Sequence, residues 1–290
     1  MLAGLGWAYS NKMGKRSIVD CAGKLLDLSQ PRVMGILNIT PDSFSDGGDF
    51  LSFDLAMEQA HRMVEEGAAI IDVGGESTRP GAPPVTETEE LNRVIPVIEG
   101  IAKDLSVPIS IDTSKPKVME AAVAAGAGLI NDVLALQAPD AIETAAALNV
   151  PVCLMHMQGE PRTMQENPSY GDVVSEVKSF LSQRIECCLS AGISRDQLLI
   201  DPGFGFGKTL DHNLTLLRDL QELAELDLPI LVGLSRKSMI GALLDEPVNH
   251  RIFGSLAAAV LAVERGACII RTHDVKPTAD ALAVSAAVLS

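Results

Sequence analysis

Polar side chains suited to binding gather in one short segment near the start of the chain. Residues 34–48 read MGILNITPDSFSDGG, in which an apolar run ends at Asn38 and a polar, glycine-ended loop follows. The loop adds three hydroxyls, two carboxylates and an aromatic ring, which belong to Thr40, Ser43, Ser45, Asp42, Asp46 and Phe44. Loops that follow buried strands carry binding and catalytic residues in α/β proteins. The segment therefore predicts a binding site.

The other apolar runs of the chain also end in polar residues. After Asn38, these ends carry Asp72, Asp112, Asn131 with Asp132, His156, Asp201, Ser235, and Arg271 with His273 and Asp274. A single Asp or Asn at such a place is as often a turn or helix N-cap residue as a functional one. Eight such ends in succession are harder to explain by local turns, and they predict one shared site. Met155 is a candidate to line it, whereas His156 is better explained as a satisfied turn residue.

Three of these residues carry hydrogen-bond acceptors and have few basic neighbours in the sequence: Asp112, Asn131 and Asp201. A carboxylate accepts two parallel hydrogen bonds, so the group suits a neutral heterocycle with adjacent N–H and NH2 donors. A metal site is the alternative, because carboxylates on separate strands also serve as Mg2+ ligands. The residues alone leave both interpretations open.

A second set of residues is basic and follows different strands. It contains Arg79, Arg236, Lys237, Arg271 and His273, which stand beside Ser or Thr in TRP, SRKS and RTH. Such groups suit phosphate or carboxylate oxygens, and Ser238 is placed to open a helix whose N–H groups favour an anion. The alternative is that they form salt bridges on the rim of an acidic protein. We expect the shared site to hold one neutral ring and at least one anion.

The elements that must position these residues alternate along the chain. Short apolar runs typical of buried parallel strands are separated by longer amphipathic stretches, which is the pattern of repeated βαβ units. The predicted strands cover residues 33–37, 69–73, 109–112, 129–132, 150–155, 198–201, 230–233 and 268–271, and the predicted helices cover 54–66, 87–103, 115–125, 140–148, 172–191, 213–222, 251–265 and 276–289. Eight strands predict an α/β fold of the (β/α)8 TIM barrel type in a single domain. A doubly wound sheet is the alternative, but no strand is followed by GxGxxG opening a helix, and GFGFGK is not a P-loop.

The composition narrows the class of partner and the compartment. A formal net charge of −15 and a pI of about 4.7 disfavour nucleic acid and anionic membranes as partners. The five cysteines are odd in number and show no CxxC spacing, which indicates a reducing compartment. No run reaches the length of a membrane span, and the N-terminus lacks a signal-peptide pattern, so we expect a cytoplasmic protein. Residues 1–16 are expected to form a loosely ordered extension, and residues 17–290 the barrel domain.

Eight segments of the chain together resemble dihydropteroate synthase. They read GILNITPDSFSDGG, IIDVGGESTRPGA, ISIDTSKP, INDV, CLMHMQGEPRTMQ, LLIDPGFGFGK, LVGLSRKSMIG and IIRTHDV, and the resemblance runs from about residue 26 to the C-terminus. It implies a (β/α)8 barrel that condenses 6-hydroxymethyl-7,8-dihydropterin diphosphate with 4-aminobenzoate and releases diphosphate in folate biosynthesis. It also implies Mg2+ as cofactor and a homodimer. Thr272 stands where such an enzyme is expected to have an apolar residue.

The same resemblance implies a role for each candidate residue. Asp112, Asn131 and Asp201 hold the pyrimidine edge of the pterin, Lys237 donates to its other edge, and Met155 and Phe206 pack near the ring. Asn38 coordinates Mg2+ on the diphosphate, whose oxygens are bound by Thr78, Arg271 and His273. The carboxylate of 4-aminobenzoate lies at Ser238, with its ring near Phe44, Pro80 and Phe206, and Arg79 belongs to a mobile second loop.

A dissociative, SN1-like reaction is expected from these groups. Neutralised diphosphate leaves, the electron-rich dihydropterin stabilises a methylene cation, and the aryl amine adds, so that no strong nucleophile or general base is needed. Asp46 is a candidate to stabilise the cation and to close the site against water. Two rival interpretations are a methyltetrahydrofolate-binding methyltransferase domain, which does not explain PDSFSDGG or SRKS, and a catalytically silent pterin-binding paralogue, which is expected to have lost Asn38, Arg79 or Lys237.

Overall fold

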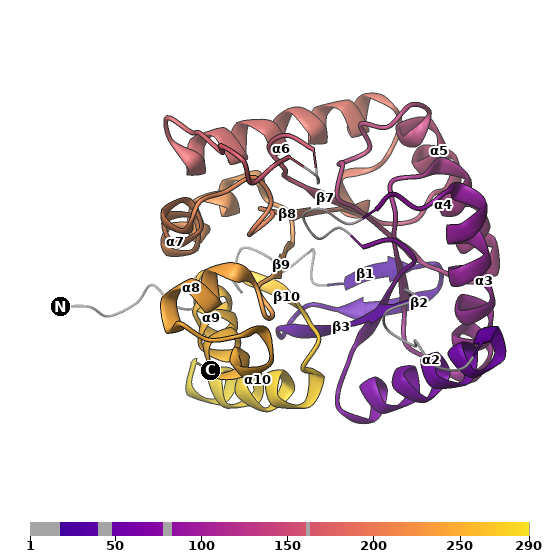
Figure 1. Cartoon of the computed structure of the whole chain (residues 1–290). Coiled ribbons are helices and arrows are strands. Elements are labelled where there is room, and N and C mark those ends of the chain that lie inside the picture. Colours follow the sequence, from indigo (N-terminus) through magenta and orange to yellow (C-terminus); the bar gives the residue numbers. More distant parts are fainter. Residues whose placement is uncertain (1–17, 40–47, 78–82, 161–162, 290) are drawn as a thin grey trace.

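The chain folds into a closed barrel of parallel strands, as the sequence predicted (Figure 1). The computed structural model describes residues 18–39, 48–77, 83–160 and 163–289. The barrel strands are β3 (Arg32–Asn38), β4 (Ile70–Gly74), β5 (Ile109–Asp112), β6 (Leu129–Asp132), β7 (Val152–Met155), β8 (Leu198–Asp201), β9 (Ile230–Gly233) and β10 (Ala267–Thr272), and β10 pairs with β3 to close the ring. Four of these strands have the predicted bounds, and the others differ by one or two residues at an end.

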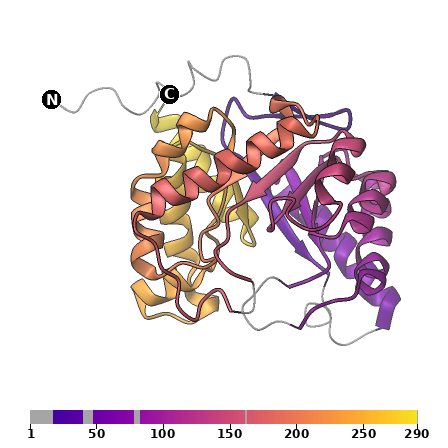
Figure 2. The same cartoon turned by 90° about the horizontal axis from the view of Figure 1, so that it is seen from above.

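Helices surround the barrel on its outer face (Figures 1 and 2). They are α2 (Gly48–Glu65), α3 (Glu87–Asp104), α4 (Pro116–Ala125), α5 (Ala141–Leu148), α6 (Val173–Ser190), α7 (Leu210–Arg218), α8 (Ser238–Leu244), α9 (Ile252–Glu264) and α10 (Val275–Leu289), with 3-10 segments η2 (Arg195–Gln197), η3 (Leu220–Leu226) and η4 (Val248–His250). Outward residues of the strands, such as Leu37 and Val73, pack beneath the helices in the main core. In the part of the chain that the structure describes, no helix is long and apolar enough to cross a membrane.

One predicted helix is divided in two. The segment 213–222 was expected to be continuous, but α7 ends at Arg218 and η3 begins at Leu220. The helix starts earlier than predicted because Thr209 forms a capping box with His212, whose ring accepts from the Thr209 backbone N–H. The amphipathic pattern is continuous across both pieces, so the sequence did not reveal the break.

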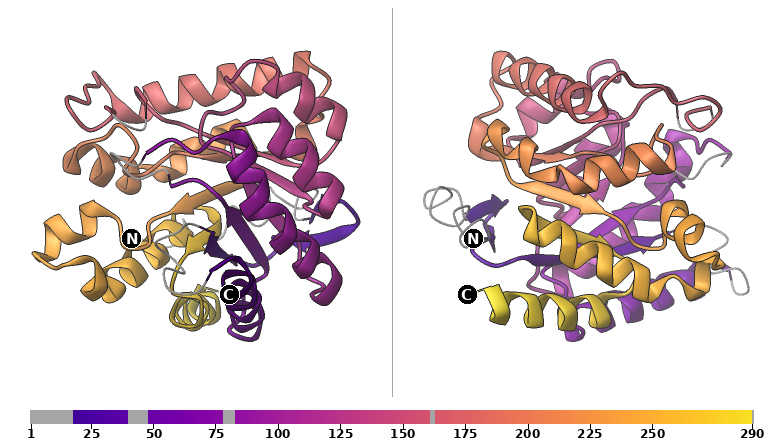
Figure 3. Two further views of the ribbon diagram at one scale, coloured as in Figure 1. Left: turned by 45° about the vertical axis from the view of Figure 1, so that its right-hand side comes forward. Right: turned by 90° about the vertical axis from the view of Figure 1, so that its left-hand side faces the viewer.

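A two-stranded hairpin closes the amino-terminal end of the barrel, and the sequence did not predict it. Its strands are β1 (Ile18–Cys21) and β2 (Lys24–Asp27), and they are joined by a two-residue turn in which Ala22 and Gly23 both have positive φ. Its Val19 and Leu26 pack with the innermost apolar side chains of the barrel. The hairpin itself can be seen at one end of the barrel in Figures 2 and 3. The turn lacks the usual Asn-Gly or Asp-Gly signal of such hairpins, which explains why it was missed.

The interior of the barrel changes from apolar to polar along its axis. Near the hairpin it is filled by side chains such as Met34, Ile70 and Leu129. Because inward residues alternate along a strand, the next inward positions of β4 after Ile70 are Asp72 and Gly74. Register places Gly74 beside both Asn38 and Asp112, and Asp112 beside Asn131. The carboxyl ends of the strands therefore bring polar groups to one rim.

Candidate active site

A cavity of about 420 Å³ opens at the carboxyl ends of the barrel strands. Its lining includes Asn38, Asp112, Phe206, Lys237, Ser238, Arg271 and His273, all of which the sequence predicted. A small recess of about 20 Å³ adjoins it, and its lining adds Asn131, Met155 and Asp201. The two hollows share Asp112, Phe206, Lys237 and Arg271, so they form one site. The predicted residues Phe44, Asp46, Thr78, Arg79 and Pro80 lie outside the described residues.

A buried ion-pair cluster lies between the recess and the cavity. Arg271 Nε donates to Asp72 Oδ2 at 2.5 Å, and its Nη2 donates to Asp112 Oδ2 at 2.7 Å. Burial raises the pKa of Asp112 to about 7, against the guanidinium of Arg271, which lowers it. The expectation that the acceptor residues have few cationic neighbours holds only along the sequence. Strand β10 closes the barrel beside β3, and this closure brings Arg271 to Asp112.

Asp72 is a site residue to which sequence reasoning gave no role. Its side chain is fully buried, and its Oδ2 also accepts from Asn131 Nδ2 at 3.2 Å. Among the described residues, Asp72 Oδ1 has no hydrogen-bond partner. Its signal was present, because Asp72 ends an apolar run as Asp112 does. Since the amide nitrogen of Asn131 is engaged by Asp72, its amide oxygen is the atom available to a ligand in the recess.

The loop after β8 supplies the other wall of the recess. The carboxylate of Asp201 accepts from the Gly203 backbone N–H at 2.7 Å, and burial raises its pKa. Lys237 Nζ lies 4.1 Å from the centroid of the Phe206 ring, which is a cation–π contact. Burial lowers the pKa of Lys237 to about 8, against the carboxylate of Asp201, which raises it.

Behind this loop lies a lysine that the sequence analysis did not identify. Lys208 is only 3% exposed, and its Nζ lies 2.9 Å from His156 Nδ1. Burial and the charge of Lys208 lower the pKa of His156 to about 3, so the imidazole is neutral at physiological pH and accepts a hydrogen bond from the ammonium. The prediction that His156 is a satisfied residue rather than a ligand-binding one agrees with this geometry.

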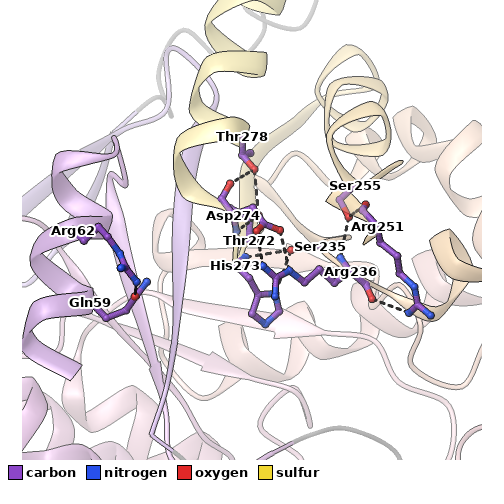
Figure 4. A network of polar contacts seen from close by, with 10 residues as sticks. All are labelled: Gln59, Arg62, Ser235, Arg236, Arg251, Ser255, Thr272, His273, Asp274 and Thr278. Carbon is purple, nitrogen blue, oxygen red and sulfur yellow. Dashed lines mark hydrogen bonds and ion pairs between the residues drawn. The ribbon is translucent and has the colours of Figure 1, made fainter. Parts of the chain in front are cut away.

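A polar network joins the end of β9 to the end of β10 and to the helices that follow them (Figure 4). Arg236 donates through Nε and Nη2 to the two oxygens of Asp274, at 3.0 and 2.6 Å. Its backbone N–H donates to Ser255 Oγ at 3.0 Å, and Ser235 Oγ lies 3.2 Å from His273 Nδ1. The network therefore fixes the turn that carries Lys237 and Ser238.

The network also accounts for two unusual features of these strand ends. Arg236 has a φ of +58°, a left-handed conformation that costs a non-glycine residue roughly 1–2 kcal/mol. Thr272 is buried where an apolar residue was expected, and its Oγ1 accepts from the Asp274 N–H at 3.1 Å and contacts Thr278 Oγ1. Asp274 is thus held from two sides: the Thr272 hydroxyl accepts from its backbone N–H, and the Arg236 guanidinium binds its carboxylate.

Replacing Arg236 by glycine and by alanine separates the backbone strain from the salt bridge. Both variants lose the bidentate pair with Asp274, but only alanine keeps the cost of the left-handed conformation. We expect Arg236→Gly to be the more stable of the two by about 1 kcal/mol in urea unfolding. Equal stabilities, or a less stable glycine variant, would show that the turn does not depend on this conformation.

Comparison with known proteins assigns the class to which this fold and site belong. The family described as pterin binding enzyme matches residues 34–273, and the chain belongs to that family. Its relatives include the dihydropteroate synthase of Haemophilus influenzae, which is 57% identical over 261 residues, covering 90% of this chain and 95% of the relative. Within the pterin-binding enzymes the chain thus belongs to the dihydropteroate synthases, which are transferases.

Two solved structures from Xanthomonas albilineans extend the likeness to the whole barrel. The dihydropteroate synthase solved with 4-aminobenzoic acid is 53% identical, with a TM-score of 0.91, and the alignment covers 95% of this chain and 99% of that one. The enzyme solved in complex with 7,8-dihydropteroate is 51% identical, with a TM-score of 0.87, over 94% of this chain and 99% of that one.

Proposed function

We propose that this enzyme condenses 6-hydroxymethyl-7,8-dihydropterin diphosphate with 4-aminobenzoate, giving 7,8-dihydropteroate and diphosphate. The observation that carries the proposal is a recess of hydrogen-bond acceptors that opens directly into a cavity bordered by cations. This combination suits a substrate with a neutral, donor-rich ring at one end and an anion at the other. The complexes of the Xanthomonas enzymes with 4-aminobenzoic acid and with 7,8-dihydropteroate support the same substrate and product.

The pterin ring is proposed to lie across the recess and the adjoining part of the larger cavity, because the recess alone measures only about 20 Å³. The carboxylates of Asp112 and Asp201 and the amide oxygen of Asn131 accept from its N–H and NH2 groups, while Lys237 donates to its opposite edge. Met155 and Phe206 form an apolar cluster there and provide the surface against which the ring packs. Burial alone raises the pKa of Asp112 and Asp201 and so disfavours their charged forms, whereas hydrogen bonds donated by the ring would favour the charged carboxylates.

The diphosphate and 4-aminobenzoate are proposed to occupy the larger cavity. Arg271 and His273 border it from the end of β10, where they face the leaving diphosphate, and Thr78 is predicted to join them. The carboxylate of 4-aminobenzoate is placed at Ser238, the first residue of α8. Because α8 has only seven residues, we assign this contact to the Ser238 hydroxyl and nearby N–H groups rather than to a helix dipole. Phe44, Pro80 and Arg79 remain predictions for the aromatic ring and the second loop.

A Mg2+ ion is proposed to bind through Asn38. The described residues contain no group of three or more His, Cys, Asp or Glu side chains that would hold a metal ion by themselves. A single amide oxygen nevertheless suits magnesium, which keeps several waters and is commonly bound through one or two protein ligands and substrate phosphates. Asn38 Oδ1 borders the cavity near Asp112, next to Gly74, whose missing side chain leaves room there. When bound, the ion would neutralise charge on the diphosphate.

The residues of the site favour a dissociative reaction. Arg271 and His273 stabilise the charge that develops on the departing diphosphate, and the acceptors of the recess orient the ring from which it departs. Ser238 and Phe206 present the aryl amine to the methylene cation that results. Asp46 remains the predicted group that stabilises this cation and excludes water.

Diphosphate release tests the proposed function directly. We expect release only when the pterin diphosphate, 4-aminobenzoate and Mg2+ are all present, together with formation of 7,8-dihydropteroate. A methyltransferase domain and a silent paralogue would each bind a pterin without releasing diphosphate in this mixture. Absence of release from folded protein that binds the pterin would therefore overturn the proposal.

A homodimer is proposed, with its interface on α8, α9 and α10. Large apolar side chains stay exposed on these adjacent helices, including Leu243, Phe253 at 80% exposed, and Val284. Figure 3 shows α9 and α10 side by side on one flank of the barrel. Exposed apolar patches of this kind mark protein–protein contacts. A second copy is the occupant that the common symmetry of soluble oligomers favours.

Phe253→Asp is expected to convert the dimer to a monomer while leaving the fold intact. The substituted carboxylate would have to be buried in the interface, whereas in the monomer the position is exposed and the change costs little. Light scattering after size exclusion measures the mass. Leu25→Asp is the matched control, because Leu25 is an exposed leucine on the hairpin, away from this patch. A dimer that persists in Phe253→Asp would place the interface elsewhere.

A cytoplasmic location is also proposed, with no nucleic acid or membrane as partner. All five cysteines are free thiols, and four of them are buried. Burial raises the pKa of Cys153 well above its usual value, so this thiol is unreactive. Fractionation of cells with an antibody to the chain tests the location.

A further inference from the structure

A buried lysine that forms no ion pair with any of the described residues lies behind the pterin recess. Lys208 Nζ donates to the carbonyl oxygens of Gly203 at 2.9 Å and Phe206 at 3.0 Å, and it contacts His156 Nδ1 at 2.9 Å. The His156 carbonyl oxygen lies at 3.5 Å. None of the ion pairs among the described residues involves Lys208. The ammonium is therefore held by backbone dipoles and a neutral imidazole.

Burying the Lys208 ammonium costs free energy that an apolar side chain at this position would not cost. Burial of an ammonium is unfavourable, and here it lowers the pKa of Lys208 to about 7, against the carboxylate of Asp201. An apolar side chain of similar volume would remove that cost. It would, however, take away the donor that the structure shows for the Phe206 carbonyl and leave the Gly203 carbonyl with the Phe206 backbone N–H alone, at 3.1 Å. Lys208 is thus required by the conformation of this particular loop.

The loop in question spans residues 202–209, and its carbonyl groups are bound by side chains from elsewhere in the fold. Gln165 Nε2 donates to the Gly205 carbonyl, Tyr170 Oη to that of Gly207 at 2.8 Å, and Asn213 Nδ2 to that of Thr209 at 2.7 Å. Lys208, which belongs to the loop itself, binds the carbonyls of Gly203 and Phe206. Gly203, Gly205 and Gly207 all have positive φ, so the loop has little intrinsic preference for this path and depends on these contacts.

The side of the loop that faces the ligand carries Phe206 and Gly205. Phe206 lies under the Lys237 ammonium, and a Cβ added at Gly205 would come within 3.2 Å of Lys237 Cδ. The loop also begins at Asp201, which is tied to it through the Gly203 N–H. Any rotation of the Gly203 or Phe206 peptides would therefore move both the aromatic wall and the Asp201 acceptor.

We propose that Lys208 is a positioning residue for the pterin recess, in which its ammonium fixes the Gly203–Phe206 turn so that Phe206 and Asp201 face the ring. His156 takes part by staying neutral and accepting from the ammonium. The inference rests on the proposed function for the identity of the ligand. It goes beyond that function because it proposes that Lys208, which does not touch the ligand, determines the shape of the recess.

Removal and chemical replacement of the ammonium test this role. Lys208→Ala deletes three carbons and the nitrogen, which n-propylammonium supplies in the same shape, while 1-propanol supplies the shape without the charge. We expect Lys208→Ala to weaken binding of the pterin diphosphate at least tenfold in calorimetry, which corresponds to about 1.4 kcal/mol. n-Propylammonium should restore most of that loss, and 1-propanol should not. Hydrogen exchange of residues 202–209 should rise in the variant and fall again with n-propylammonium.

Two further variants make the outcome decisive. Lys208→Met fills the cavity without a charge, and it should reproduce the binding defect even if the alanine variant folds poorly. Lys178→Ala is the matched control, because Lys178 pairs with Glu225 at the surface, and neither it nor the parent should respond to n-propylammonium. Parent-like pterin affinity in Lys208→Met, or equal rescue by n-propylammonium and 1-propanol, would overturn the positioning role. Failure of the proposed function would appear differently, as a parent enzyme that binds the pterin diphosphate without releasing diphosphate, or that does not bind it at all.

Discussion

Replacing Asp112 by alanine is expected to abolish pterin binding. The variant loses two charge-assisted hydrogen bonds to the ring, each contributing roughly 1.5–3 kcal/mol. It also removes one of the two carboxylates that the Arg271 guanidinium binds and leaves Asp72 as the other. Together these losses amount to at least about a hundredfold in affinity, which calorimetric titration with the pterin diphosphate measures. Arg79→Ala is the contrast, since the resemblance places Arg79 on the second loop: we expect pterin binding mostly to be spared and turnover to be slowed.

The pH dependence of pterin binding provides an independent test of the role of Asp112. Burial raises the pKa of Asp112 to about 7, and only the carboxylate form accepts two hydrogen bonds from the ring. Pterin affinity of the parent should therefore fall as the pH is lowered below about 7, by up to about tenfold per pH unit. In Asp112→Asn this dependence should be lost. Parent-like affinity in Asp112→Ala, or an unchanged pH profile in Asp112→Asn, would contradict the assignment.

Replacing Arg271 by methionine is expected to have the largest effect on stability. The substitution leaves the fully buried carboxylate of Asp72 beside the largely buried carboxylate of Asp112 without their cation. Breaking a buried pair in this way costs about 3–5 kcal/mol, which urea unfolding measures. Diphosphate release should fall to background, because the same guanidinium is proposed to neutralise the leaving group.

The pH dependence of that defect has a definite sign. Loss of Arg271 removes the group that lowers the pKa of Asp112, so in the folded variant this pKa rises further above its value in the unfolded chain. The folded state then binds more protons than the unfolded state across mildly acidic pH, and its stability rises as the pH falls. The deficit should accordingly be smaller at pH 5 than at pH 8. Arg271→Met/Asp72→Asn, which removes one carboxylate as well, should recover part of the loss at pH 8.

The barrel was predictable because its strands are short, apolar and separated by amphipathic helices. The hairpin that closes its base was not, because β1 and β2 have four residues each and meet at an Ala-Gly turn. The break between α7 and η3 was missed for a related reason, since the apolar pattern continues through it. Tertiary contacts decide whether such short strands form and where such a helix breaks, and hydrophobic periodicity does not detect either feature.

Some residues of the candidate site could likewise be predicted from the sequence, and others could not. Residues at strand ends, such as Asp112, Asn131 and Asp201, were found because the topology of a barrel gathers all such ends. Asp72 and Lys208 were not given roles, because their importance depends on partners 199 residues away in the case of Asp72 and 52 in the case of Lys208. The left-handed backbone of Arg236 leaves no mark on the sequence, since glycine is the residue that normally reveals it.

The separation of charge around the mouth also decides which way a substrate can enter. Acceptors come from β4, β5, β6 and β8, whereas Lys237, Arg271 and His273 come from the neighbouring ends of β9 and β10. A molecule that is neutral at one end and anionic at the other is admitted in one orientation and rejected in the reverse one, because its phosphates would then meet Asp112 and Asp201. Like-charge contacts of this kind disfavour the reversed mode of binding.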